Sequence, residues 1–317
     1  MCKAAKAVLA AQGSPTKPSF HEGLEDHIHR IPESIRAVLK ELRESPTLCA
    51  LHLSGVRVDP DRCGPTPLSW QEALDDSRQE LEEAQLALPA SCLGGVFAWP
   101  TIQRGRMVQN LVPVESDRYE QSGHGPVVLE RHTEDGFHQD RCRYLALLGV
   151  RNPDRVPTTL GTVHDVRLTD EHRSVLSERR FLIRPDLEHL RQSAESAPDS
   201  ETLRRAREMY ENPEPVALLF SSPEAPCLRI DAPYTAALPG DDEVAEALAA
   251  IVDELDRAQR DVVICERDVL IVDNYRAVQG CRAYRPRFDG TDRWLKRMSV
   301  VGDPLSEAAA GAGARAL

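Results

Sequence analysis

The 317-residue sequence lacks three features that each define a large class of proteins. It has no run of about 18 consecutive apolar residues, which excludes a membrane-spanning helix. No Cys-x-x-Cys pair occurs among its eight cysteines, so zinc ribbons and redox dithiols are not expected and the cysteines are interpreted as reduced thiols. No glycine-rich turn joins a strand to a helix, which excludes a dinucleotide fingerprint and a phosphate loop.

Positive charge is also scarce, with 39 Lys and Arg residues against 51 Asp and Glu residues and a formal net charge of −12 at pH 7. Nucleic acids and anionic membranes require a basic face on their protein partner, so we expect neither partner. The N-terminal stretch has an apolar core of only AVLAA and no cleavage site, which favours a cytoplasmic protein over an exported one. The oligomeric state stays open.

The order of the predicted elements indicates a single domain over residues 1–317. With 41% hydrophobic and 28% charged residues, the chain has enough apolar side chains for one large core. Helical periodicity comes first, and short apolar segments separated by Pro, Gly, Asn and Asp follow. We therefore predict a mainly helical cap over residues 1–90, a β-sandwich or jelly-roll core with helical insertions over 91–304, and a flexible tail over 305–317.

Individual elements follow from the spacing of apolar residues. Pro32 is expected to break the first helical stretch into a pair. The predicted helices cover residues 19–45, 69–86, 169–179, 201–211 and 241–259, and the predicted strands cover 94–100, 106–114, 143–150, 215–220 and 266–274.

Two groups of residues carry chemical information. His132 and Glu134 are two residues apart, and on an extended strand this spacing puts an imidazole and a carboxylate on one face, where they can converge on one metal ion. A salt-bridging pair at a strand edge is the alternative. Arg293 and Arg297 follow a predicted strand, and two arginines could each clamp a different carboxylate through paired hydrogen bonds.

Together these stretches resemble the clavaminate synthase-like branch of the Fe(II)- and 2-oxoglutarate-dependent oxygenases, which includes arginine, asparagine and lysine hydroxylases of peptide-antibiotic pathways. The resemblance lies in residues 121–159, which contain VVLERHTEDGFHQD, and in residues 267–297, which contain DGTDRW. It implies an α+β, mainly β fold, with a double-stranded β-helix (a cupin-like jelly roll) as core and helices outside. It also implies Fe(II), 2-oxoglutarate and O₂ as cofactor and co-substrates.

The resemblance assigns cofactor roles to residues that match the family motifs. His132 and Glu134 would bind the iron. Arg293 would bind the distal carboxylate of 2-oxoglutarate, assisted by Thr159 or its neighbour Thr158 in VPTTL.

Three further matches imply contacts with an amino-acid-like small molecule. Arg297 would hold its α-carboxylate, Ser122 its backbone and Asp231 a basic or amide side chain. Asp231 could equally be a turn-forming residue before Pro233, and Pro233 stands where guanidinium-binding relatives carry a second acid. The implied activity is hydroxylation of a free amino acid or a derivative in secondary metabolism, with desaturation or ring closure starting from the same hydrogen abstraction.

The third iron ligand departs from the family pattern. The family places a histidine fourteen residues before the 2-oxoglutarate arginine, where this sequence has Gln279, and no histidine follows His189. A glutamine amide oxygen binds divalent first-row metals more weakly than imidazole does. Gln279 could be a weak third ligand, water could take its place, or iron chemistry could be lost. The last outcome would make the protein a catalytically silent jelly roll that binds a small carboxylate or a partner protein.

Other residues near the iron motif receive weaker assignments. We expect Arg131 to face away from the metal, because neighbouring residues on a strand alternate between its faces. His138 is expected in the substrate pocket or behind it, with an ordinary polar histidine as the alternative. His164, His172 and His189 lie in polar contexts and are interpreted as surface residues.

Overall fold

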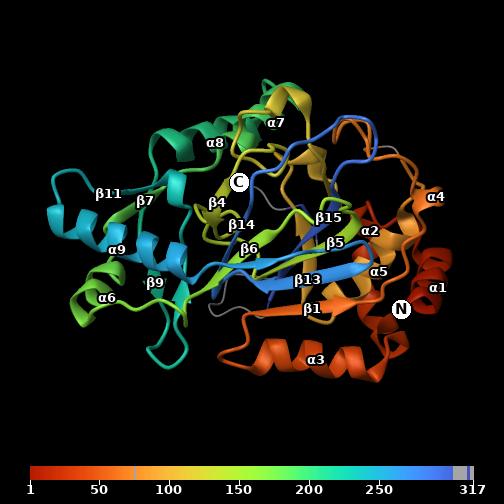
Figure 1. Cartoon of the computed structure of the whole chain (residues 1–317), viewed down its shortest axis with the longest axis horizontal. Coiled ribbons are helices and arrows are strands. Elements are labelled where there is room, and N and C mark those ends of the chain that lie inside the picture. Colours follow the sequence, from red (N-terminus) through yellow and green to blue (C-terminus); the bar gives the residue numbers. More distant parts are fainter. Residues whose placement is uncertain (75, 303–312, 315–317) are drawn as a thin grey trace.

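The computed structural model describes residues 1–74, 76–302 and 313–314. Two antiparallel sheets lie at the centre, with the N-terminal helices on one side and a second group of helices and short strands at the opposite end (Figure 1). The fold is therefore mixed α/β with mostly antiparallel sheets. None of the described helices is long and apolar enough to cross a membrane.

Seven strands form the larger central sheet: β1 (Ala50–Ser54), β2 (Gly95–Ala98), β3 (Gln109–Leu111), β5 (Tyr144–Arg151), β13 (Asp268–Asp273), β15 (Trp294–Val301) and β16 (Gly313–Ala314). Their order is β1-β13-β5-β15-β2-β16, with β3 also pairing β15, and only the β16–β2 pair is parallel. Strands β5 and β13 are buried along almost their whole length, as their continuous apolar sequences predict.

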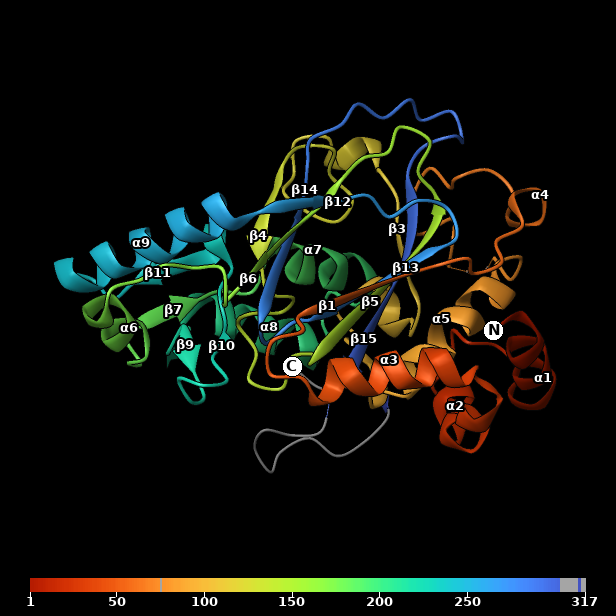
Figure 2. The ribbon, with the colours of Figure 1, turned by 60° about the horizontal axis from the view of Figure 1, so that its bottom comes forward.

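Four strands form the smaller central sheet: β4 (Leu129–His132), β6 (Thr158–Thr162), β12 (Arg260–Val262) and β14 (Ala277–Cys281). Their order is β12-β6-β14-β4, and all pairs are antiparallel. Figure 2 shows β4, β6, β12 and β14 beside the strands of the larger sheet. Side chains of both sheets line one cavity, so the functional site lies between them.

The N-terminal helices, called the cap helices below, are α1 (Cys2–Gln12), α2 (Pro18–His21), η1 (Leu24–Arg30), α3 (Glu33–Glu44), α4 (Pro60–Cys63) and α5 (Glu80–Ser91). Pro32 is the residue before α3, so the predicted break is confirmed. Helix α5 contacts β2, β5 and β15, and most of its residues are buried. It therefore lies between the large sheet and the outer cap helices.

The helix predicted over residues 69–86 is wrong in its first half. Helix α5 begins only at Glu80. Before it, Asp76 accepts hydrogen bonds from the backbone N–H of Arg78 (3.0 Å) and from the side-chain amide of Gln79 (3.0 Å). Such local bonds between side chain and backbone stabilise a turn in place of a helix.

The remaining elements are helices and short strands, and residues from two of them line the cavity. Helices predicted over 169–179, 201–211 and 241–259 are confirmed within three residues, whereas the strand predicted over 215–220 is divided in two. The tail predicted over 305–317 lies outside the described residues apart from Gly313–Ala314. The elements are η2 (Gln103–Gly105), η3 (Glu115–Asp117), α6 (Asp170–Leu176), β7 (Phe181–Ile183), α7 (Leu187–Ser196), α8 (Glu201–Glu211), β8 (Pro215–Val216), β9 (Leu219–Phe220), β10 (Cys227–Leu228), η4 (Ala232–Tyr234), β11 (Thr235–Ala237) and α9 (Asp242–Ala258).

Strand β15 separates the cap from the functional cavity. Successive side chains on a strand point to opposite faces, and β15 follows this rule strictly. Its cavity-facing side chains are Leu295, Arg297 and Ser299, and the side chains on the cap side are Trp294, Lys296 and Met298. One strand thus carries a cation on each face, a buried lysine toward the cap helices and a half-buried arginine toward the cavity.

The cation on the cap side belongs to a buried ionic cluster. The Nζ atom of Lys296 lies 2.7 Å from Glu83 Oε1 and 2.7 Å from Asn110 Oδ1, and Arg106 Nη2 donates to the same Glu83 oxygen at 2.9 Å. Burial raises the pKa of Glu83, but the two cations outweigh it and the pKa is lowered. Glu83 is the anion that permits two cations between cap and sheet.

We predict that Glu83→Gln destabilises the fold by about 3–5 kcal/mol, because it leaves two buried cations without their anion. The free energy of unfolding in urea measures the effect. Glu44→Gln is the matched control, since Glu44 is exposed and only 3.9 Å from Lys40 on the same helix, a pair worth less than about 1 kcal/mol. Equal losses in both variants would contradict this role of Glu83.

Candidate active site

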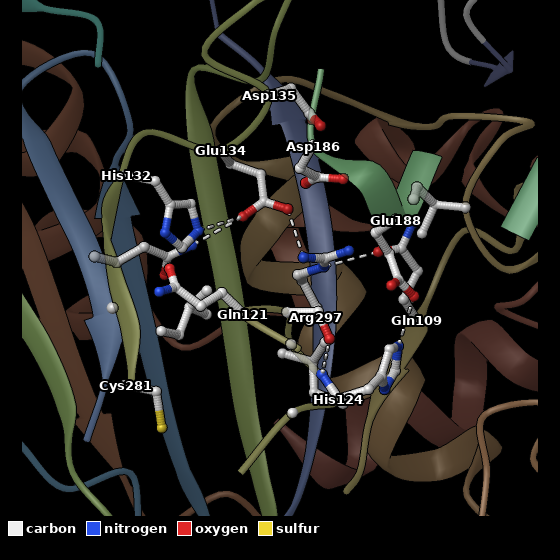
Figure 3. A pocket seen from close by; sticks show the side chains of 18 of the residues that line it. Gln109, Gln121, His124, His132, Glu134, Asp135, Asp186, Glu188, Cys281 and Arg297 are labelled. Atoms are coloured by element: carbon white, nitrogen blue, oxygen red, sulfur yellow. Dashed lines mark hydrogen bonds and ion pairs between the residues drawn. The ribbon is translucent and has the colours of Figure 1, made fainter. Parts of the chain in front are cut away.

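A cavity lies between the two central sheets and is bounded on a third side by the start of α7 (Figure 3). Titratable side chains from both sheets and from the loops around them converge in it. They are His124, His132, Glu134, Asp135, Asp186, Glu188, His189, Asp231, Arg293 and Arg297.

The β4–β14 pairing sets the first part of the site. His132, the last residue of β4, is the register partner of Gln279 on β14. Its Nδ1 lies 2.8 Å from the backbone oxygen of Glu130. A carbonyl can only accept, so Nδ1 carries the proton and the Nε2 atom faces the cavity, 3.6 Å from Glu134 Oε2.

Glu134 lies just beyond the end of β4, and its backbone is fixed by one residue. Asn274, at the end of β13, accepts from the Glu134 N–H at 2.6 Å through Oδ1 and donates to the Glu134 carbonyl at 3.0 Å through Nδ2. The Asn274 side-chain amide thus makes the two backbone hydrogen bonds that a neighbouring strand would otherwise make. His132 and Glu134 therefore converge as predicted, although Glu134 is held in a turn and not on the strand.

Both oxygens of the buried Glu134 carboxylate accept hydrogen bonds. Arg297 Nη1 donates to Oε1, and Gln279 Nε2 donates to Oε2 at 3.0 Å (Figure 3). Burial alone raises the pKa of Glu134, but Arg297 and then His132 outweigh it and lower the pKa to about 2. Burial lowers the pKa of His132, but hydrogen bonding to Glu134 and the charge of Asp231 raise it to about 9. Without a metal, His132 and Glu134 thus form an ion pair, and the Gln279 amide donates a hydrogen bond to the same carboxylate.

The donor atoms fit a divalent metal ion with one weak ligand. Among residues 1–74, 76–302 and 313–314, no three His, Cys, Asp or Glu side chains form a group that could hold a metal. His132 Nε2 and Glu134 Oε2 are strong donors that already face each other. A half-turn of the Gln279 amide exchanges its nitrogen and oxygen and would present a neutral oxygen as the third donor. Iron would thus be held by two strong ligands and one amide.

A second polar group lies at the end of the cavity formed by the small sheet. Arg293 Nη2 donates to Thr158 Oγ1 at 3.2 Å, and both residues line the cavity. Of the two threonines in VPTTL, Thr158 pairs with Cys281 on the cavity face, whereas Thr159 pairs with Gly280 and packs on the other face. Neighbouring residues on a strand face opposite sides, so the register with β14 decides which of the two threonines faces the cavity.

Arg297 lies between Glu134, a predicted metal ligand, and Gln109 of β3. Besides its ion pair with Glu134, it donates through Nε to Gln109 Oε1 at 2.8 Å. Ser122 also lines the cavity, and its Oγ accepts from the backbone N–H of His124 at 3.1 Å. The predicted substrate residues Arg297, Ser122 and Asp231 therefore share the cavity with the predicted metal ligands.

Two carboxyl groups line the cavity next to the metal ligands. Asp231 forms an isolated antiparallel bridge with His132, and burial raises its pKa to about 7. Asp186 precedes α7 and accepts from the backbone N–H of His189 at 3.2 Å. Burial also raises the pKa of Asp186. Buried carboxylates whose charged forms are disfavoured make the cavity attractive to a cation.

The structure settles the weaker assignments. Arg131 faces away from the cavity, as predicted, and its Nη2 lies 2.7 Å from Asp256 on α9. His138 packs on the Trp99 ring behind the cavity wall, with ring centroids 4.7 Å apart, and does not line the cavity. The interpretation of His189 as a surface residue is wrong, because its side chain is 1% exposed.

Several cavity residues were not singled out from the sequence. Asp186 and Glu188 belong to RPDLEHL, where an aspartate before an apolar residue is a helix N-cap signal. That signal predicts the helix but not its position over the cavity. Gln109 has no comparable local signal, because its role depends on pairing with Arg297 across the sheet.

Comparisons with known proteins agree with this geometry. No protein-family model matches the chain. The chain is 36% identical over 282 residues to an enduracididine beta-hydroxylase of Streptomyces hygroscopicus, which covers 86% of this chain and 82% of that protein. It is 34% identical over 289 residues to an L-ornithine/L-arginine 3-hydroxylase of Catenulispora acidiphila, which covers 88% of this chain and 82% of that protein.

A solved structure gives the same result. The non-heme iron oxygenase OrfP, in complex with Fe, succinate and (3S)-hydroxy-L-Arg, is similar with a TM-score of 0.89 and 34% identity, over 95% of this chain and 91% of that one. Fold and cavity thus define a non-heme iron oxygenase. Within that class, the chain belongs to the amino-acid hydroxylase family that contains these proteins, and the resemblance in the sequence is confirmed.

We predict that Asp231→Asn stabilises the metal-free protein at high pH. The raised pKa means that folding favours the neutral carboxyl, so the wild type loses stability as the pH rises from the unfolded value of 3.8 through about 7. In urea unfolding, the variant should gain up to about 4 kcal/mol near pH 8 and almost nothing near pH 4. Asp253→Asn, an exposed change on α9, is the control. A gain that does not depend on pH would contradict the assignment.

Proposed function

We propose that the protein is an Fe(II)- and 2-oxoglutarate-dependent oxygenase that hydroxylates a free amino acid with a cationic side chain. The observation that carries this proposal is the cavity itself. It combines His132 and Glu134 with Arg293, Arg297 and buried carboxyl groups in one enclosed space. A protein without this chemistry would have no use for that combination.

The cofactor residues divide between the two ends of the cavity. His132 and Glu134 would hold iron, with Gln279 as the weak third ligand, and Arg293 with Thr158 would hold the distal carboxylate of 2-oxoglutarate. Structures of OrfP contain Fe with alpha-ketoglutaric acid and Fe with succinate. When bound, the cofactors supply the oxidising power, and 2-oxoglutarate and O₂ are consumed while succinate and CO₂ are released.

The chain's own residues would position the amino acid. Arg297 is the cation available for an α-carboxylate, and Ser122 lies on the loop beside it. A substrate carboxylate would share Arg297 with Glu134. Asp231 and Asp186 would pair with a cationic side chain, which would also relieve the cost of burying their charges.

The choice of a cationic substrate rests on the two carboxyl groups. An enduracididine hydroxylase, an ornithine/arginine hydroxylase and OrfP with hydroxy-arginine are among the similar proteins. Pro233 also lines the cavity, so a second acid is absent there, but Asp186 faces the same space. We therefore include arginine and shorter cationic amino acids in the substrate class.

The proposal extends to the architecture. We infer that the two facing central sheets form a double-stranded β-helix, with cap, core and tail as parts of a single domain. The antiparallel strand orders support this inference. Free thiols at all eight cysteines support a cytoplasmic location. A silent binding protein is the alternative, and Gln279 is the feature that favours it.

Anaerobic titration with Fe(II) and 2-oxoglutarate, followed by an amino-acid panel, tests the function. We expect a saturable charge-transfer band in the visible region. L-Arginine, L-ornithine or L-lysine should then stimulate succinate release at least about tenfold more than neutral L-citrulline, because a neutral group leaves the buried acids unpaired. A band without a preference for cations would overturn the substrate class. A folded protein without a band would favour the silent alternative.

We predict that Gln279→His tightens iron binding by about tenfold or more, because imidazole replaces a weaker neutral oxygen. Anaerobic calorimetric titration with Fe(II) measures the affinity. Gln121→His, at the exposed rim of the same cavity, is the matched control and should leave the affinity unchanged. An unchanged affinity in Gln279→His would place Gln279 outside the coordination sphere.

A further inference from the structure

Three residues of the HTED block, His132, Glu134 and Asp135, line the cavity, and Thr133 and Asp135 also hold its walls. His132 and Glu134 face the cavity. Thr133 holds the wall that carries Asp231: its backbone N–H and its hydroxyl donate to the Ile230 carbonyl at 2.7 and 3.0 Å, and the Ile230 N–H donates to its Oγ1 at 3.2 Å. The residue next to Ile230 is therefore fixed relative to the metal ligands.

Asp135 holds the opposite wall. Its φ of 53° is left-handed, which a non-glycine residue adopts only where its surroundings hold it. Its Oδ2 accepts from Trp99 Nε1 at 2.6 Å, and its Oδ1 accepts from His189 Nε2 at 2.9 Å. Both oxygens of this carboxylate are thus directed away from the metal ligands and toward other elements.

His189 completes the connection to α7. Its Nδ1 lies 2.7 Å from Thr101 Oγ1, so both ring nitrogens have partners. The ring also packs against Phe137, with centroids 5.1 Å apart. The first turn of α7 therefore cannot move without breaking contacts with the loop that contains Asp135 and Phe137.

That turn carries two cavity residues just before His189 in the sequence. Asp186 caps the helix, and Glu188 accepts from Arg191 on the same helix at 2.6 Å. Both acids line the cavity, and the His189 side chain, which also lines it, reaches the loop that bears Glu134. A chain of hydrogen bonds thus joins the cavity wall formed by α7 to the loop that carries Glu134.

We propose that His189 is a positioning residue that couples substrate binding to metal binding through Asp135. An amino acid that orders the first turn of α7 fixes His189 and Asp135, and these fix the loop on which Glu134 presents its carboxylate. Coupling between sites is reciprocal, so a bound metal also tightens substrate binding. The substrate part of this inference rests on the proposed function, but the link between α7 and the loop does not.

Hydrogen–deuterium exchange on the ligand-free protein tests the link. His189→Phe keeps an aromatic ring and removes both hydrogen bonds, whereas His189→Gln keeps an amide N–H for Asp135. We expect the peptide covering residues 132–138 to exchange at least about tenfold faster in the Phe variant, with the Gln variant close to wild type. His172→Phe on α6 is the control. Unchanged exchange in His189→Phe would overturn the proposal.

A metal titration tests the coupling with a second readout. Co(II), a redox-stable probe, is titrated with and without saturating L-arginine or L-ornithine. In the wild type we expect the amino acid to lower the Co(II) Kd about 5–10-fold, and in His189→Phe the ratio should fall to about one. The Gln variant should restore most of the ratio. The same ratio in wild type and Phe variant would overturn the coupling.

The two arms separate failure of this inference from failure of the proposed function. If no cationic amino acid alters Co(II) binding or succinate release in the wild type, the proposed substrate class fails, and exchange in residues 132–138 still decides the link. If the wild type responds and His189→Phe responds equally, the function stands and the inference fails. In turnover, the inference requires a raised KM and more succinate per hydroxylated product in His189→Phe, effects that loss of folded protein alone would not produce.

Discussion

The burial of the Glu134 carboxylate is the constraint on which the rest of the site depends. A charge removed from water must be paired and hydrogen-bonded, or its pKa rises and it becomes neutral. That pairing comes from Arg297 on the larger sheet and from Gln279 and His132 on the smaller sheet. The sheets must therefore lie at one separation, with one register in each, for the carboxylate to be ionised at all.

The same strand that satisfies Glu134 also attaches the cap. Arg297 projects from one face of β15 toward the cavity, and Lys296 projects from the other toward Glu83 of α5. Each cation is paired with one buried carboxylate, so an error in strand parity would separate both pairs. The cap helices therefore supply the counterion of Lys296 as well as covering the central sheet.

The features that the sequence predicted correctly depend mainly on residues that are close together in the chain. The 3.6-residue periodicity of α8 and α9, the break at Pro32 and the convergence of His132 and Glu134 all depend on neighbours in sequence. Other features depend on distant contacts or on register. Thr158 and Thr159 are indistinguishable until the pairing with β14 is known, and His189 looks like a surface residue until Asp135, 54 positions away, is placed beside it.

Gln279 shows why an amide can persist at the position of a histidine. An imidazole presents one lone pair and one N–H in fixed directions, whereas an amide has donors and an acceptor that exchange by a half-turn. Here the amide donates to Glu134 and holds the carboxylate without a metal, and the same side chain turned over would offer its oxygen to one. In the metal-free structure the amide therefore keeps the carboxylate hydrogen-bonded. As a metal ligand the amide would bind more weakly than an imidazole, so the other contacts that fix Glu134 would matter more, including those of Asn274 to its backbone and of the loop to α7.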